Sequence, residues 1–188
     1  LHRMLLMAQK NVEASFRSVL DRDEEELAEV EKTEEYIDFL NREISLHVSH
    51  LIAYETNQQA SAEISGFFII CGNIERIGDH ADNLAGYTRM LNQRNIIFSS
   101  EAQQEIAAMR DICMDGINQL LSPEAGSEAW LAQVADLEQR IDDMTRDYRR
   151  IHLVRMQNGD CSAEAGILYS ELLTDFERIG DHILNIAQ

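Results

Sequence analysis

Apolar residues recur along this chain at alternating steps of three and four residues, which is the period of one face of an α-helix. Proline occurs once, at Pro123, and glycine is scarce, so long stretches lack residues that break helices. The pattern predicts six helices and no sheet. We expect the first helix to end near residues 21–23 and the second to run from about 24 to the mid-fifties. The third covers about 61–91, the fourth runs from 100 to about 120, the fifth covers about 128–156, and the sixth begins at about 160.

The second half of the chain resembles the first. The hexamer ERIGDH occurs at residues 75–80 and again at 177–182, and each copy is followed three residues later by an asparagine. The apolar positions that precede the hexamer also align between the two halves. The offset of this alignment changes by a few residues, and these changes fall in the links between helices, as an old duplication would leave them. The sequence therefore predicts an all-α fold of six helices, arranged as two tandem antiparallel three-helix bundles over residues 1–97 and 98–188. Between the halves, Ser100 and Gln103 form a candidate capping box.

The charge balance restricts the partners of the protein. Asp and Glu number 34 against 16 Lys and Arg, for a formal net charge of -18. Such a surface repels nucleic acid, anionic lipid headgroups and free phosphate, so we expect no nucleic-acid partner. The three cysteines, Cys71, Cys113 and Cys161, show no CxxC spacing, which is typical of core thiols in a reducing compartment. No apolar run is long enough to span a bilayer, but the chain opens on Leu1 without Met, as a piece of a longer protein would.

Four Glu-x-x-x-Asp pairs place carboxylates one turn apart on the same helix face. Single pairs of this kind arise by chance in an acidic chain, but all four are Glu then Asp at matching positions of the two halves. Glu34 and Glu138 also interrupt the apolar stripes of their helices, where an ionised side chain is costly unless it is paired or bound to metal. The candidate ligands are Glu34, Asp38, Glu75 and Asp79 in the first half and Glu138, Asp142, Glu177 and Asp181 in the second.

If neighbouring helices pack antiparallel, each half brings two Glu and two Asp to one groove. Clustered carboxylates without thiolates favour hard cations such as iron, manganese, magnesium or calcium over zinc. Gly78 and Gly180 lie inside the hexamer helices at a cost of about 1 kcal/mol each, which indicates close approach of a partner helix or room for an ion.

A second interpretation of the hexamer needs no metal. Arg76 stands at helical spacing from Asp79 and His80, so the motif also fits a lattice of salt bridges on a solvated face. His80 and His182 directly follow Asp, whereas di-iron bundles use Glu-x-x-His, so structural or supporting roles suit these histidines better than ligation. Asn83 and Asn185 are spaced to hydrogen-bond the preceding Asp.

Taken together, the doubled E-R-I-G-D-H-x-x-N, the upstream E-x-x-x-D and the two three-helix halves resemble the PhoU family of phosphate-signalling regulators. The resemblance covers nearly the whole chain. It implies multinuclear metal clusters, iron above all, held by the eight carboxylates named above. The stretch at residues 54–65 departs from the Pro-containing segment of soluble PhoU proteins, and together with the first four residues it is more similar to the cytoplasmic tail of bacterial sodium/phosphate cotransporters.

We therefore predict a non-enzymatic, cytoplasmic regulatory domain at the inner face of the plasma membrane, attached to or acting on the membrane domain of a phosphate transporter, with a homodimer as one allowed assembly. A free-standing PhoU-type regulator is the nearest alternative. A ferritin-type carboxylate metalloenzyme and a metal-free, spectrin-like interaction bundle are the other two classes that the residues admit.

Overall fold

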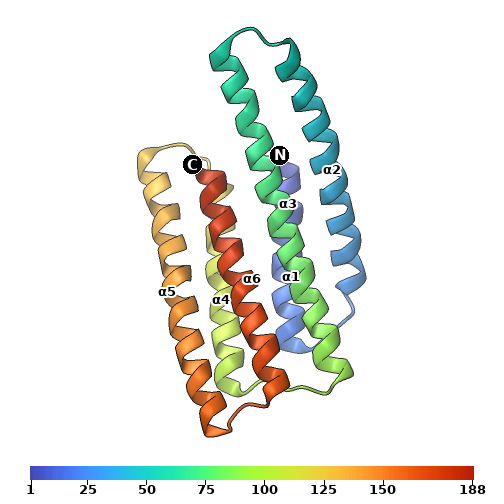
Figure 1. The fold of residues 1–188 in the computed structure, drawn as a ribbon, viewed down its shortest axis with the longest axis vertical. Helices are drawn as coiled ribbons and strands as arrows, with labels where there is room; N and C mark the ends of the chain where they lie inside the picture. The colour runs from blue at the N-terminus through green and yellow to red at the C-terminus, as the bar shows by residue number, and fades with distance from the viewer.

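The computed structural model describes residues 1–188 as six α-helices joined by short links, without a β-strand (Figure 1). The helices are α1 (His2–Asp21), α2 (Leu27–Tyr54), α3 (Gln58–Gln93), α4 (Ser100–Leu120), α5 (Glu128–Asn158) and α6 (Ala163–Ala187). The predicted all-α fold of six helices is confirmed. The bounds differ from the predicted ones by a few residues, since α2 begins at Leu27 rather than near residue 24 and α3 begins at Gln58 rather than near residue 61.

Side-chain caps set the starts of four helices. Asn57 accepts from the backbone N–H groups of Gln59 and Ala60, and serines act in the same way before α4, α5 and α6. The predicted capping box at Ser100 and Gln103 is wrong by one residue. Ser99 is the cap, accepting from the N–H of Ala102, while the Gln103 side chain donates to the carbonyl of Phe98.

Four helices form the middle of the molecule, and two flank it. The pairs α1–α3, α1–α4, α3–α6 and α4–α6 all pack together, whereas α2 contacts only α1 and α3, and α5 contacts only α4 and α6 (Figure 1). The hexamer-bearing helices α3 and α6 thus have an outer helix on one side and each other on the opposite side. This placement gives every hexamer two distinct neighbours.

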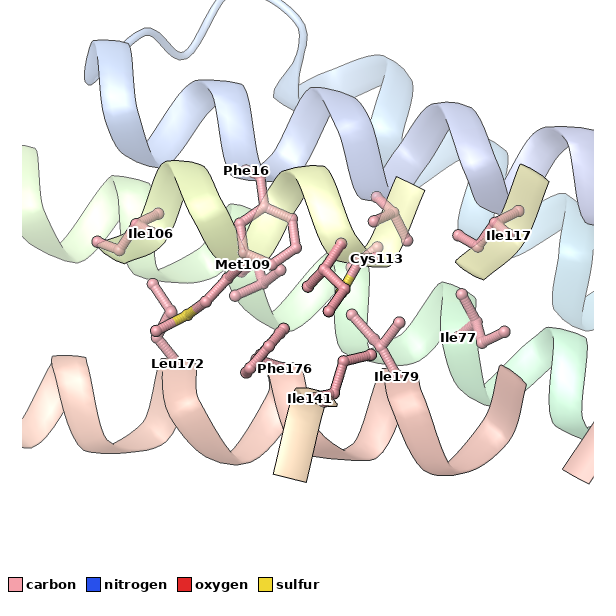
Figure 2. Packing of buried hydrophobic residues seen from close by; sticks show 14 of the residues in the cluster. Phe16, Ile77, Ile106, Met109, Cys113, Ile117, Ile141, Leu172, Phe176 and Ile179 are labelled. Atoms are coloured by element: carbon pink, nitrogen blue, oxygen red, sulfur yellow. The ribbon is translucent and has the colours of Figure 1, made fainter. Parts of the chain in front are cut away.

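One hydrophobic core runs through both repeats. Figure 2 shows Phe16 of α1, Met109 of α4 and Phe176 of α6 close together, with Ile141 of α5 beside them and Ile77 of α3 further along the same core. The units over residues 1–97 and 98–188 therefore share a core instead of forming two separate ones. None of the six helices has the combination of length and apolar character that crossing a membrane requires.

Candidate metal centre

The glycine of each hexamer lies where the outer helix comes closest. A Cβ atom placed on Gly180 would be 2.9 Å from Cγ2 and 3.0 Å from Cδ1 of Ile141 on α5. On Gly78 the nearest atom would be Cδ1 of Ile37 on α2, at 3.4 Å. Close helix approach, one of the two reasons predicted for these glycines, is what the structure shows. It brings the carboxylates of α2 next to those of α3, and those of α5 next to those of α6.

The two glycines differ in a way that a matched pair of substitutions can test. Gly180→Ala forces a Cβ against a β-branched, buried Ile141, so we expect a loss of about 1–2 kcal/mol in the free energy of unfolding. Gly78→Ala meets Ile37 at ordinary contact distance, so the better helix propensity of alanine should leave stability unchanged or raise it by up to about 1 kcal/mol. Urea denaturation of both variants checks this, and equal effects would contradict the difference in packing.

Four predicted ligands of the first half lie on facing helices and, with Asp82, form what we call the first cluster. Burial and the nearby charges of Asp79 and Asp82 raise the pKa of Glu34 from 4.5 to about 7. The pKa of Glu75 is raised by burial and then by Asp79, and that of Asp79 is raised by burial, with Arg76 acting against the shift. The carboxylates of α2 and α3 whose charges raise these pKa values therefore lie in one region, but the close approach of three oxygens found in the second half is not found among them.

Asp82 was not among the eight candidate ligands. It lies one turn after Asp79 on α3, and its Oδ1 is buried without a hydrogen-bond partner. Burial and the charge of Glu31 raise its pKa. The equivalent position in the second repeat is Leu184, so the comparison of the two halves marks a difference there and gives no support for Asp82 as a ligand. An acid two residues after the hexamer was the only available signal.

Three predicted ligands of the second half converge most closely, and with Glu177 they form the second cluster. Carboxylate oxygens of Glu138, Asp142 and Asp181 all lie within 4.8 Å of one another. Hard cations bind oxygen at about 2.0–2.6 Å, so two oxygens on one ion stand at most about 4–5 Å apart. Burial, followed by the charge of Asp142, raises the pKa of Glu138, and burial followed by Glu177 raises that of Asp142. The spacing and the donor atoms both fit a hard cation.

Glu177 and Asp181 also contact arginines. The guanidinium of Arg149 on α5 donates to Glu177 Oε2 at 2.9 Å, and Arg178 donates to Asp181 Oδ2 at 3.0 Å. Glu177 accordingly stands outside the trio of close oxygens. The position equivalent to Arg149 in the first repeat is Ser45, so Glu75 has no such partner on the outer helix. The first cluster thus has one more carboxylate and less positive charge than the second.

The salt-bridge interpretation of the hexamer applies to only part of it. Arg178 pairs with Asp181, but Arg76 is exposed and its closest acid is Glu75, at 3.8 Å. Exposed pairs of this kind contribute little to stability. They do not offset the burial of the first-cluster carboxylates and the repulsion among them, which together raise the pKa of Glu34.

The histidine and asparagine of the first hexamer segment face the other repeat. His80 Nδ1 lies 2.7 Å from Oδ1 of Asp175 on α6, and Asn83 donates to the same oxygen at 3.0 Å. The hydroxyl of Tyr87 donates to Oδ2 at 2.6 Å. Asp175 is 5% exposed, so this buried carboxylate is held entirely by side chains of α3. We call these four residues the Asp175 network.

The second hexamer segment repeats this arrangement in weaker form. His182 Nδ1 and the Asn185 amide both contact Oδ1 of Asn73 on α3, at 2.9 and 3.3 Å. Asn73 occupies the position equivalent to Asp175, so each hexamer contacts the same place on the other. The rings of His80 and His182 stack between them with centroids 5.5 Å apart. Burial and the neighbouring His80 lower the pKa of His182 to about 4.

The predicted hydrogen bonds from Asn83 and Asn185 to the preceding Asp are therefore replaced by bonds to the opposite repeat. Supporting roles for His80 and His182 agree with their positions, since both rings lie between α3 and α6. Cys71 and Cys113 are buried, and Cys161 is half-buried. The acids of each hexamer thus face the outer helix of the same repeat, whereas its histidine contacts the hexamer-bearing helix of the other repeat.

Comparison with known proteins identifies relatives over nearly the full chain. The sequence model of the PhoU domain family matches residues 1–88 and 106–188 of this chain. A Thermotoga maritima protein named phosphate-specific transport system accessory protein PhoU homolog 1 is 26% identical over 189 residues, which cover 99% of this chain and 80% of the relative. A Xylella fastidiosa homologue with a corresponding name is 28% identical over 187 residues, covering 99% of this chain and 78% of the relative.

Two solved structures share the fold. PhoU from Pseudomonas aeruginosa superposes with a TM-score of 0.89 at 21% identity, covering 98% of this chain and 88% of that one. The phosphate transport system regulatory protein PhoU from Streptococcus pneumoniae gives a TM-score of 0.83 at 18% identity, covering 99% of this chain and 87% of that one. At these identities the likeness concerns the arrangement of the helices.

Proposed function

Because this chain belongs to the PhoU domain family, we propose that it is a non-enzymatic regulator of phosphate transport that holds metal ions in its two carboxylate clusters. The names of its relatives assign them accessory roles in phosphate-specific transport. The observation that supports metal binding most directly is the convergence of Glu138, Asp142 and Asp181. Acids of equivalent position recur in the first cluster, where Asp82 adds a buried oxygen without a partner.

The ligands we propose are the eight predicted carboxylates, joined by Asp82 in the first cluster. All donors are hard oxygen atoms, which suits iron, manganese, magnesium or calcium, and the resemblance to the PhoU family implies iron first. In the second cluster the close trio would hold the ion, and Glu177 would join it by leaving Arg149. Bound cations supply positive charge, which would turn a region that repels phosphate into one that attracts it.

A carboxylate oxidase of ferritin type is less well supported. Such a site needs histidine ligands beside its glutamates, one turn along the same helices. His80 and His182 instead stack on each other between the two repeats and are bonded to Asp175 and Asn73. We therefore assign the metal a regulatory role.

Elemental analysis of untagged protein purified without chelators tests the proposal. We expect stoichiometric iron or manganese in the wild type, and loss of about half of it in the triple variant Glu138→Gln, Asp142→Asn, Asp181→Asn, since that variant removes one of two clusters. A control with the same charge change, Glu124→Gln, Glu128→Gln, Asp136→Asn, alters acids outside the proposed ligand set and should keep its metal. Wild type without metal would favour the helical interaction bundle.

A finer proposal concerns how the domain reaches its transporter. The similarity of residues 54–65 to the tails of sodium/phosphate cotransporters favours a cytoplasmic domain at the inner face of the plasma membrane, joined to a transporter in the same chain. The reading frame decides between this and a free-standing regulator. A run of membrane spans encoded upstream in the same frame supports the tail, and their absence there supports the separate protein.

A further inference from the structure

Arg149 is the only basic side chain of the outer helices α2 and α5 that hydrogen-bonds to one of the eight candidate ligands. Its Nη2 atom donates to Glu177 Oε2 at 2.9 Å and to Thr174 Oγ1 at 3.3 Å, so α6 holds the guanidinium at two points. The side chains of Arg149 and Glu177 are 45% and 33% exposed. The pair can therefore separate without any change in the packing of α5 on α6.

Glu177 is close enough to the other carboxylates of the second cluster to act on them. After burial, its charge is the largest contribution that raises the pKa of Asp142. The oxygens of Glu138, Asp142 and Asp181 already lie within 4.8 Å of one another, and a hard cation takes about six oxygen ligands. Glu177 is thus the next protein donor for an ion held by these three residues, and Arg149 is bonded to it.

The first repeat has neither of the two residues that hold the guanidinium in place. Ser45 and Gly72 stand at the positions equivalent to Arg149 and Thr174. The hydroxyl of Ser45 donates to Asn41 on its own helix at 3.5 Å, and a Cβ atom placed on Gly72 would have no neighbour within 4 Å. The first repeat therefore has room for a guanidinium at this place but no basic residue to supply one.

We propose that Arg149 is a built-in counter-ion of the second cluster, which competes with the metal ion for Glu177 and so weakens metal binding there. This inference rests on the proposed function of the clusters. A divalent ion entering the trio is repelled by the guanidinium, and Glu177 can ligate it only after losing a charge-assisted hydrogen bond. The first cluster lacks this competitor, so the arginine limits the metal affinity of one cluster and not of the other.

Manganese titration of chelator-treated protein at pH 8, with the free ion measured by electron paramagnetic resonance, tests the inference. The second cluster is measured alone in a background that disables the first, with Glu75→Gln, Asp79→Asn and Asp82→Asn. Adding Arg149→Ser, which copies the first repeat, should lower the manganese dissociation constant about tenfold, because a positive charge beside the ion is removed. Arg149→Lys keeps that charge and should stay within about threefold of the background.

The reciprocal change places an arginine beside the first cluster. Ser45→Arg is made in the triple variant described above, in which the second cluster is disabled. Because the space at Gly72 admits the new side chain, we expect manganese to bind about tenfold more weakly. Arg150→Ser in the first background is the control for loss of charge, since Arg150 pairs with Asp147, is 74% exposed and contacts no candidate ligand. It should leave the dissociation constant unchanged, and circular dichroism checks that every variant keeps its helices.

Three results would overturn the inference. Arg149→Ser could leave the manganese affinity of the second cluster unchanged, Arg150→Ser or Arg149→Lys could tighten it as much, or Ser45→Arg could bind manganese as tightly as its parent. In each of these cases the clusters still bind the metal, so the proposed function stands. A wild type that binds no manganese overturns both, and this result is distinct from the other three.

Discussion

Manganese added to chelator-treated protein, at about a hundredfold excess over its dissociation constant, is expected to raise the free energy of unfolding by about 2.7 kcal/mol per occupied cluster. The reason is that folding buries carboxylates and brings them near enough to repel one another, and both effects raise the pKa values of Glu34, Glu75 and Glu138. A cation that binds the folded chain removes this repulsion. Urea denaturation with manganese and with a chelator measures the difference.

The pH dependence of this effect should identify the first cluster. Glu34 has a pKa of about 7 in the folded chain and 4.5 as its ordinary value, so about half of these side chains carry a proton at pH 7. The chelated protein should lose stability as pH rises from about 4.5 through 7, because the unfolded chain ionises at the lower pH. Manganese must displace that proton, so its affinity for this cluster should fall about tenfold per pH unit below pH 7.

Glu34→Gln provides the control for both trends. It should stabilise the chelated protein at pH 8 and leave it unchanged at pH 4, where the wild-type side chain is neutral in both states. Manganese that binds with equal affinity at pH 5 and pH 8, or that leaves stability unchanged, would argue against carboxylate ligation by the first cluster.

Asp175→Ala is expected to lower the free energy of unfolding by about 3 kcal/mol. The substitution removes the acceptor of His80, Asn83 and Tyr87 at the contact between α3 and α6. Each polar group left without a partner away from water costs about 1 kcal/mol or more, and the carboxylate is also the charged member of the network. Urea denaturation monitored by the circular dichroism of the helices measures this loss.

Two further variants test whether the loss of stability comes from the hydrogen bonds of the Asp175 network. Asp175→Asn keeps an acceptor and copies the residue that the first repeat has at Asn73, so it should lose about 1 kcal/mol. Asn73→Ala removes the weaker, partly solvated counterpart and should cost less than Asp175→Ala. If Asp175→Ala changes stability by less than about 1 kcal/mol, the network does not hold the two repeats together.

The candidate site could be predicted from the sequence as far as single helices determine it. Glu75 and Asp79 share a helix face because backbone hydrogen bonds fix 3.6 residues per turn, whatever surrounds the helix. The duplication then indicated that Glu177 and Asp181 do the same. Neither argument identified which arginine would approach, and Arg149 of α5 reaches Glu177 across the packed pair of helices.

The same arguments could not predict the contacts between the two repeats. Asp175 looks like any acid of a charged helix until α3 lies against α6 and surrounds it with donors. Asp82 has no equivalent in the second half, so the repeat gave it no support. The exposure of Phe67, Phe68 and Ile69 was also not predicted, because these residues of α3 have the same apolar character as those that α1 covers.

The sequence by itself determined the helices, their duplication and the pairing of acids one turn apart, because these follow from local backbone geometry and apolar period. Only the tertiary structure decided which carboxylates share a cluster, which of them an arginine contacts, and that the hexamers meet through His80 and His182. These outcomes depend on how each helix is rotated and where its neighbours end. The packing of one core common to the two repeats sets the rotation of each helix and the place where its neighbours end. No single segment specifies that packing.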